Sequence, residues 1–226
     1  MVEGVFVTAT GTDIGKTYIS ALLVKAMRQH GLHCGYYKAV LSGARSIHES
    51  DAGFVNEFAQ IDQEKESLLS YLYKTPVSPH LAAKLEGNPV SLRKIKADYK
   101  KVCCSFDYVV TEGSGGIVCP LRWDEEAQIL LEDIVKALSL SCLVVADAGL
   151  GTINATVLTT EYLKQRQIHI SGIILNHYTG NEMERNNIKM IEILTGVPVL
   201  ACVKEGDVNL NISLNKLKDI FKREVF

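Results

Sequence analysis

The sequence lacks the features by which membrane, secreted and nucleic-acid-binding proteins are recognised. No apolar stretch approaches the roughly 20 residues that a membrane-spanning helix needs. The opening residues MVEGVFVTAT carry an acid and no basic cluster, so we expect no secretory signal. The formal net charge of −2 gives no electrostatic reason to expect nucleic acid or an anionic membrane as a partner. We therefore predict a cytoplasmic protein.

The six cysteines form no CxxC pair and no spacing typical of a metal site. Most stand beside apolar or aromatic residues, and we expect small buried side chains. The chain also lacks internal repeats and any linker rich in proline or glycine. With 226 residues, 47% of them apolar, it has the size of one α/β domain and is short for two. We predict a single domain over residues 1–226.

Short apolar runs alternate with amphipathic stretches, a pattern typical of βαβ units around a parallel sheet. Runs such as VFVT, CLVVAD and GIILN suit strands that are buried on both faces. We predict strands at Val5–Thr8, Cys34–Lys38, Tyr108–Thr111, Leu143–Ala146, Gly172–Leu175 and Val197–Cys202. We predict helices at Lys16–His30, His48–Phe58, Pro79–Leu85, Leu92–Val102, Leu130–Leu138, Thr152–Gln167, Met183–Leu194 and Leu210–Lys222. The predicted fold is an α/β domain with one doubly wound, mostly parallel sheet between two layers of helices, and ligands of such sheets lie beyond the carboxyl ends of the strands.

The first predicted strand leads through ATGTDIGKT into a helix that begins near Lys16. Glycines at positions 11 and 15 allow a tight turn whose N–H groups converge on phosphate oxygens, and the helix N-terminus adds partial positive charge. Lys16 is expected to reach the β- and γ-phosphates, and the Thr17 hydroxyl to bind Mg²⁺. The expected nucleotide-binding residues of this segment are Asp13, Ile14, Gly15, Lys16, Thr17 and Tyr18. The sequence therefore predicts an ATP site and a P-loop NTPase-like fold.

The loop is not a strict GxxxxGK[ST], since three residues separate Gly11 from Gly15. The alternative is a glycine-rich turn without a ligand, and the GKT triplet between strand and helix favours the phosphate site. Partitioning and septum-placing ATPases carry KGGxGKT, with a lysine at the place that Gly11 occupies here. A second cation for the phosphates must then come from another element.

Lys38 is a candidate for that second cation. It ends the predicted strand Cys34–Lys38 and is followed by Ser42 and Gly43. A lysine at a strand end is commonly solvated. Beside a phosphate loop, its charge would offset the negative charge on a transferred phosphoryl group and on an anionic substrate.

Glu112 follows another predicted strand, at the position where P-loop enzymes hold a metal ligand, and the glycines after it allow close approach of a ligand. Asp51 is a second candidate ligand, although Asp and Ser50 are equally able to cap a helix. Asn176 ends the strand GIILN, where an amide could read a base or could serve a turn. The expected nucleotide contacts on these segments are Asp51, Glu112, Gly113, Ser114, Gly115 and Asn176.

Taken together, ATGTDIGKT, GYYKAVLSG, SDA, VSPH, TEGSGG, DAGLGTIN and the late ILN resemble dethiobiotin synthetase, in that order and at similar intervals. The resemblance extends from residue 5 to about residue 200. It implies an ATP- and Mg²⁺-dependent ring closure in biotin synthesis. In that reaction 7,8-diaminononanoate takes up CO₂ as a carbamate, the carbamate attacks the γ-phosphate, and the second amine closes the cyclic urea and expels phosphate.

The resemblance also implies roles for single residues. Lys38 matches the active-site lysine, acting with Lys16 and with Thr12, which matches a loop threonine near the carbamate. The implied metal ligands are Thr17, Asp51 and Glu112. Asn176 matches the residue that reads adenine, and the proline expected beside the base is absent from CVKEGD, which leaves nucleotide selectivity open. The family is a homodimer, so that substrate contacts are expected from Ser42 and, across the dimer, from Gly149, Gly151 and Asn154.

Three other readings remain. A ParA/MinD-like nucleotide switch is disfavoured by Gly11 and by the presence of Lys38. An amidotransferase-coupled ligase for cobyrinic-type acids would carry a glutaminase domain, for which we see no room in this sequence. A catalytically silent binding module is expected to have lost Lys16 or Lys38, and both are present.

Overall fold

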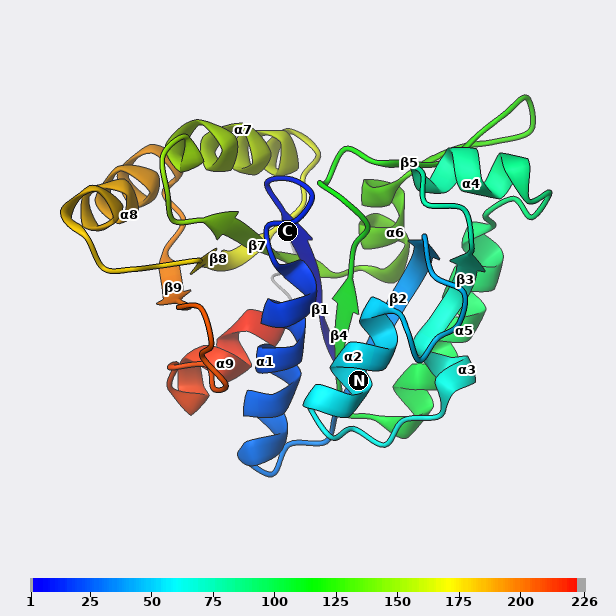
Figure 1. The fold of residues 1–226 in the computed structure, drawn as a ribbon, viewed down its shortest axis with the longest axis horizontal. Coiled ribbons are helices and arrows are strands. Elements are labelled where there is room, and N and C mark those ends of the chain that lie inside the picture. Colours follow the sequence, from blue (N-terminus) through cyan, green and yellow to red (C-terminus); the bar gives the residue numbers. More distant parts are fainter. Residues whose placement is uncertain (1, 223–226) are drawn as a thin grey trace.

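A seven-stranded parallel sheet forms the centre of the computed structural model, which describes residues 2–222. The strand order is β3-β2-β4-β1-β7-β8-β9 (Figure 1). The strands of this sheet are β1 (Glu3–Ala9), β2 (Cys34–Ser42), β3 (Leu69–Tyr73), β4 (Tyr108–Glu112), β7 (Ser141–Asp147), β8 (Ile170–Asn176) and β9 (Val199–Cys202). A separate antiparallel hairpin consists of β5 (Pro120–Trp123) and β6 (Gln128–Leu130).

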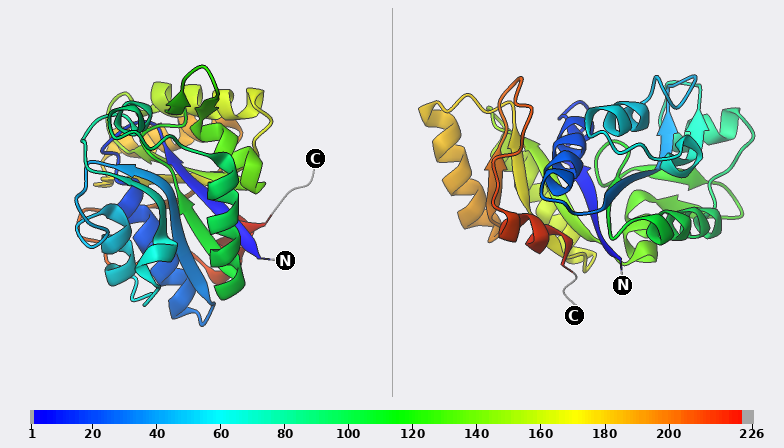
Figure 2. Two further views of the ribbon diagram at one scale, coloured as in Figure 1. Left: turned by 90° about the vertical axis from the view of Figure 1, so that its right-hand side faces the viewer. Right: turned by 90° about the horizontal axis from the view of Figure 1, so that it is seen from below.

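Helices cover both faces of the sheet, as the two views of Figure 2 show. They are α1 (Lys16–Gln29), α2 (Asp51–Phe58), α3 (Lys65–Leu68), α4 (Pro79–Leu85), α5 (Leu92–Ser105), α6 (Leu131–Leu138), α7 (Thr152–Gln165), α8 (Glu182–Thr195) and α9 (Leu214–Phe221). Successive residues of a strand point to opposite faces. Accordingly, Val5 and Val7 of β1 pack in the core with α1 and α9, while Phe6 packs in the core with α5 and α6. The predicted three-layer α/β fold is confirmed.

The strand β2 is longer than the sequence pattern predicted, and this changes the place of Lys38. The strand continues through buried Ala39, Val40 and Leu41 to Ser42, because β3 pairs with this half of it. Strand β3, in which buried and partly exposed residues alternate, was not predicted from the sequence. Lys38 therefore lies in the middle of its strand, and Ser42 is its last residue.

Other boundaries also differ from the prediction. Helix α2 begins at Asp51 and not at His48, because Ser50 is the N-cap and its hydroxyl accepts a hydrogen bond from Gly53 N. Helix α9 begins at Leu214, with Ser213 as its cap. The short α3 and the β5–β6 hairpin were not predicted. The cysteines match expectation in part, since Cys34, Cys119 and Cys142 are buried, Cys103 and Cys202 are partly exposed and Cys104 is exposed.

Within residues 2–222, no helix combines the length and apolar character that crossing a bilayer requires.

Candidate functional site at the carboxyl edge of the sheet

The segment between β1 and α1 has the geometry of a phosphate-binding loop. Gly15 adopts a left-handed conformation with φ 92°, which turns the chain into α1. No side chain caps this helix, so its first N–H groups remain available to a ligand. Lys16 folds back over the loop, and its Nζ donates a hydrogen bond to Gly11 O at 3.1 Å. The loop therefore offers backbone donors, a helix N-terminus and a lysine to an anion.

A buried cluster of charges stands beside this loop. Lys38 Nζ lies 2.5 Å from Asp51 Oδ2 and 2.7 Å from Glu112 Oε1. The Thr17 hydroxyl donates to the same Glu112 Oε1 at 2.8 Å, and the Tyr36 hydroxyl donates to Glu112 Oε2 at 2.9 Å. Three donors thus converge on one carboxylate that is 1% exposed, which is how a buried charge is stabilised.

Sheet register brings these residues together. Lys38 of β2 is the direct partner of Glu112 of β4, and Glu112 in turn is the partner of Val7 in β1, the strand that leads into the loop. Tyr36 precedes Lys38 by two residues and therefore projects from the same face of β2. Because Ser50 caps α2, the carboxylate of Asp51 is free to pair with Lys38.

The cluster shifts the pKa values of its members. Burial by itself would lower the pKa of Lys38, but the carboxylates of Glu112 and Asp51 outweigh it and raise that pKa above the ordinary value. Burial lowers the pKa of Lys16, against the effect of Glu112 and with a further contribution from Lys38. Burial and the Glu112 charge raise the pKa of Tyr36 well above 10, so its hydroxyl remains a donor. At neutral pH, Lys38 is a fixed positive charge.

A cavity of about 750 Å³ opens between the loop and this cluster. Its far wall is the segment Pro76–Pro79, and the Ser42 hydroxyl at the end of β2 donates to Val77 O at 2.7 Å. Ser114 Oγ donates to Val40 O and lies on the wall nearest β4. The predicted residues that line the cavity are Thr12, Asp13, Gly15, Lys16, Thr17, Lys38, Ser42, Asp51, Glu112, Ser114 and Gly115. The cavity could hold a small substrate next to a terminal phosphate.

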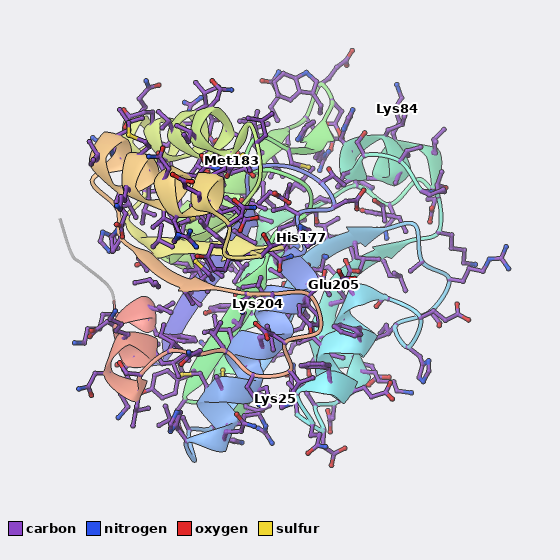
Figure 3. All side chains as sticks on the ribbon, turned by 60° about the vertical axis from the view of Figure 1, so that its left-hand side comes forward. Lys25, Lys84, His177, Met183, Lys204 and Glu205 are labelled. Carbon is purple, nitrogen blue, oxygen red and sulfur yellow. The ribbon has the colours of Figure 1, made fainter. Side chains whose placement is uncertain are left out.

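On the other side of the loop, Asn176 at the end of β8 is 5% exposed and its Nδ2 donates to Ile14 O at 2.9 Å. The same Nδ2 is 3.2 Å from His177 Nε2, and His177 Nδ1 is 2.7 Å from Asp147 Oδ2 of β7. Figure 3 shows His177 near Lys204 and Glu205, which follow β9. The two segments are joined by a hydrogen bond from Tyr178 N to Val203 O at 2.9 Å.

Comparison with known proteins shows relatives that match nearly the whole chain. A curated relative from Brachyspira hyodysenteriae, ATP-dependent dethiobiotin synthetase BioD, is 48% identical over 93% of this chain and 96% of its own. One of the same name from Clostridium botulinum is 45% identical over 98% of this chain and 99% of its own. The chain belongs to the dethiobiotin synthetase family. A family model described as AAA domain matches residues 3–208.

The fold of this chain is also similar to that of partitioning ATPases. The solved structure of a ParA family ATPase from Chlorobium tepidum matches with a TM-score of 0.56 and 15% identity, over 97% of this chain and 89% of its own. At that identity the likeness concerns the fold alone. It does not favour the nucleotide-switch alternative for this member of the synthetase family.

Three residues predicted to contact substrate lie outside the cavity. Gly149, Gly151 and Asn154 follow β7 and begin α7, and none of them is among the cavity-lining residues. Gly149 N instead donates a hydrogen bond to Asp147 Oδ1 at 2.7 Å. Gly151 and Asn154 are exposed. Tyr18 and Gly113, predicted to contact the nucleotide, do not line this cavity either. The Tyr18 hydroxyl donates to Asp207 O at 2.5 Å, and Gly113 N donates to Val7 O at 2.9 Å.

The oxygen atoms of Thr17, Asp51 and Glu112 are of the kind that Mg²⁺ prefers. Among the described residues, no group of three or more His, Cys, Asp or Glu is arranged to hold an ion. A magnesium ion here would therefore need water and phosphate oxygens to complete its coordination, as is usual for Mg²⁺ in nucleotide sites. The residues fit that requirement.

Sequence reasoning missed Tyr36, Asp147 and His177. Tyr36 had a usable signal, because it is two residues before Lys38 on a strand and must share its face. Asp147 and His177 each stand at the end of a predicted strand, but their contact had no local signal, since they lie 30 residues apart in the sequence and meet only because β7 and β8 pair as neighbours.

Proposed function

We propose that this chain catalyses ATP-dependent synthesis of dethiobiotin from 7,8-diaminononanoate and CO₂, releasing ADP and phosphate. The observation that carries the proposal is the contact of Lys38 with Asp51 and Glu112 beside the phosphate loop, where all three residues line one cavity. The names of the relatives, at 48% and 45% identity, support the choice of reaction. We extend the proposal to a single P-loop domain over residues 1–226, acting in the cytoplasm.

The proposed reaction brings one anion against another, because a carbamate must approach the γ-phosphate. Fixed positive charge lowers this repulsion, and the reaction needs correct placement more than a protein nucleophile. Lys38 is held charged by its two carboxylates, and Lys16 lies over the phosphate loop. Thr12 lines the cavity near Gly115, where it would face the carbamate and phosphate, and Ser42 would contact the diamine.

Thr17, Asp51 and Glu112 are the proposed Mg²⁺ ligands. The bound ion would offset charge on the phosphates of ATP and on the leaving phosphate. The buried oxygen of Glu112 is already oriented by Tyr36, so this ligand would need little reorganisation. Asp51, whose side chain is 47% exposed, can move more easily between Lys38 and an ion.

We also propose that the enzyme is a homodimer in which Gly149, Gly151 and Asn154 contact the substrate in the partner's cavity. Their position outside this chain's own cavity is consistent with such a role. The apolar side chains of Leu150 and Leu158 nearby are 93% and 63% exposed. Sedimentation velocity tests the proposal, and a monomer at catalytic concentration would contradict it.

The test of function is phosphate release from ATP, Mg²⁺ and bicarbonate, with and without diaminononanoate, followed by mass analysis of the product. We expect release that depends on the diamine and a product heavier by one carbonyl, with CO added and two hydrogens lost. Release that ignores the diamine would refute the synthetase and favour a nucleotide switch.

A further inference from the structure

The side chain of Asn176 faces the phosphate loop but takes no part in the charged cluster. It contacts His177, which in turn contacts Asp147. Asn176 Nδ2 reaches Ile14 O at 2.9 Å, and a Cβ on Gly15 would lie 2.2 Å from the same nitrogen. The amide of Asn176 is therefore packed directly against the loop. Nothing in the proposed transfer of phosphate uses these side chains.

The orientation of the Asn176 amide follows from its partners. A backbone carbonyl can only accept a hydrogen bond, so the atom next to Ile14 O must be the NH₂ group. That group also lies 3.2 Å from His177 Nε2, which must then accept its second hydrogen. His177 consequently carries its own proton on Nδ1, where Asp147 Oδ2 accepts it at 2.7 Å.

Both hydrogens of the Asn176 amide are thus used within the protein. Among the hydrogen bonds of residues 2–222, none uses Asn176 Oδ1. The group that remains for a ligand is therefore an acceptor and not a donor. Without His177, the amide would keep one anchor at Ile14 O and lose the other, so that its plane could turn.

The position of this acceptor relative to the phosphates identifies what it would meet. Lys38, Asp51 and Glu112 lie on the β2–β4 side of the loop, so the terminal phosphate belongs on that side. The rest of the nucleotide must then extend to the opposite side, where β8 ends at Asn176. A base there would present its edge to Oδ1.

We propose that His177, held by Asp147, is a positioning residue that sets the Asn176 amide to accept from an exocyclic amine of the base. This inference rests on the proposed nucleotide site. A 6-amino purine donates to such an oxygen, whereas a 6-oxo purine places one acceptor against another. A site built to pair with one polar group rejects the analogue that cannot pair, because the buried group is left unsatisfied.

The test compares ATP with ITP, which differs from ATP in carrying an oxo group in place of the 6-amino group. Dissociation constants are measured by titration calorimetry with Mg²⁺, and tripolyphosphate serves as a probe without a base. For the wild-type chain we expect ATP to bind about tenfold or more tightly than ITP. Equal affinity for ATP and ITP would overturn the inference.

Two variants separate the two nitrogen atoms of the imidazole. His177→Asn places an amide near the position of Nδ1 and suits the left-handed backbone of this residue, at φ 56°. The new Asn side chain can still donate a hydrogen bond to Asp147, but it is too short to contact Asn176. His177→Gln extends to the position of Nε2, and its carbonyl can accept from Asn176 Nδ2. We expect the ATP-to-ITP preference to fall to about threefold or less in His177→Asn and to be largely restored in His177→Gln.

Tripolyphosphate distinguishes base reading from general support of the loop. We expect its affinity to change less than about twofold in His177→Asn, because the bond from Asn176 to Ile14 O remains. A wild-type ATP-to-ITP ratio in His177→Asn, or an equal loss of ATP, ITP and tripolyphosphate affinity, would overturn the inference. Neither result bears on diamine-dependent phosphate release with ATP, which tests the proposed function separately.

Discussion

The two sides of the phosphate loop are built from different chemistry. On the β2–β4 side, the side chains of Lys38 and Glu112 are charged and only 5% and 0% exposed. On the β7–β8 side, those of His177 and Asp147 are 50% and 42% exposed, and a neutral hydrogen bond joins His177 to Asn176. Buried charges act strongly on other charges, whereas directional bonds distinguish donors from acceptors. In the proposed reaction, the charged side would act on the transferred phosphoryl group, and the β7–β8 side would recognise the part of the nucleotide that stays behind.

Among the substitutions on the charged side that keep Lys38, Glu112→Gln should have the largest effect. The neutral amide removes a ligand from the proposed magnesium site and takes a charge away from Lys38 and Thr17. We expect the Mg²⁺ concentration for half-maximal phosphate release to rise at least about tenfold, and turnover to fall about 10²-fold. An unchanged Mg²⁺ titration would remove Glu112 from the metal site.

Glu132→Gln is the matched control for this variant. Glu132 is also a buried carboxylate, 3% exposed, but it bonds Tyr162 and Arg166 away from the cavity. It should lower the free energy of unfolding without raising the Mg²⁺ requirement.

Gly15→Ala should disturb both sides at once. The new Cβ would sit at φ 92° and 2.2 Å from Asn176 Nδ2, so the loop and the Asn176 amide must both shift. We expect ATP affinity, measured by calorimetry, to fall at least about tenfold.

Gly31→Ala imposes comparable backbone strain at the other end of α1, with φ 75° and no atom within 4 Å of the new Cβ. It should cost about 1 kcal/mol of stability and preserve ATP affinity. Equal losses of ATP affinity in the two variants would show that strain alone explains the effect.

Tyr36→Phe tests whether the hydrogen bond from the neutral Tyr36 hydroxyl stabilises the Glu112 carboxylate. It removes one of three donors to the Glu112 carboxylate, and we expect the free energy of unfolding by urea to fall by about 1–3 kcal/mol. Tyr37→Phe, on the opposite face of the same strand, removes a bond to Ser70 instead. Only Tyr36→Phe should raise the Mg²⁺ requirement. If both variants behave alike, Tyr36 has no special connection to the site.

Asp98→Asn should have the smallest effect, because Asp98 belongs to an ion-pair cluster at the surface of α5. Although partial burial opposes it, hydrogen bonds from Lys94, Lys101 and Ser70 lower the pKa of Asp98 to about 2. A lowered carboxyl pKa stabilises the fold above the unfolded value near 3.8, and this stabilisation disappears as pH falls through 2.

Because solvent screens these charges, we expect the free energy of unfolding of Asp98→Asn to be about 0.5–1 kcal/mol below that of the wild type at pH 7. Urea unfolding at pH 7 and at pH 2.5 measures it, and a difference that grows at low pH would contradict the assignment.

The sequence was sufficient to predict the β1–α1 loop and Glu112, because apolar runs, glycines and a strand-end carboxylate are local signals. It placed Lys38 at a strand end, although β2 continues to Ser42. That error arose because the pairing partner β3, in which buried and partly exposed residues alternate, was not recognised from the sequence.

The β7–β8 side could be predicted only in part. Asn176 was found from its strand-end position, but its support depends on the pairing of β7 with β8, which no local pattern encodes. The roles proposed for Gly149, Gly151 and Asn154 likewise involve a second chain. Contacts between distant segments are therefore what the sequence left undetermined.

The separation of the two sides is tested most directly by Lys38→Met, with turnover and nucleotide binding measured on one preparation. The substitution removes the fixed charge expected to face the carbamate and leaves the contacts of Asn176 and His177 in place. We expect diamine-dependent phosphate release to fall by about 10²–10³-fold, while ATP affinity and the ATP-to-ITP ratio change less than about threefold. Turnover within about threefold of wild type, or a loss of nucleotide binding as large as the loss of turnover, would contradict the account.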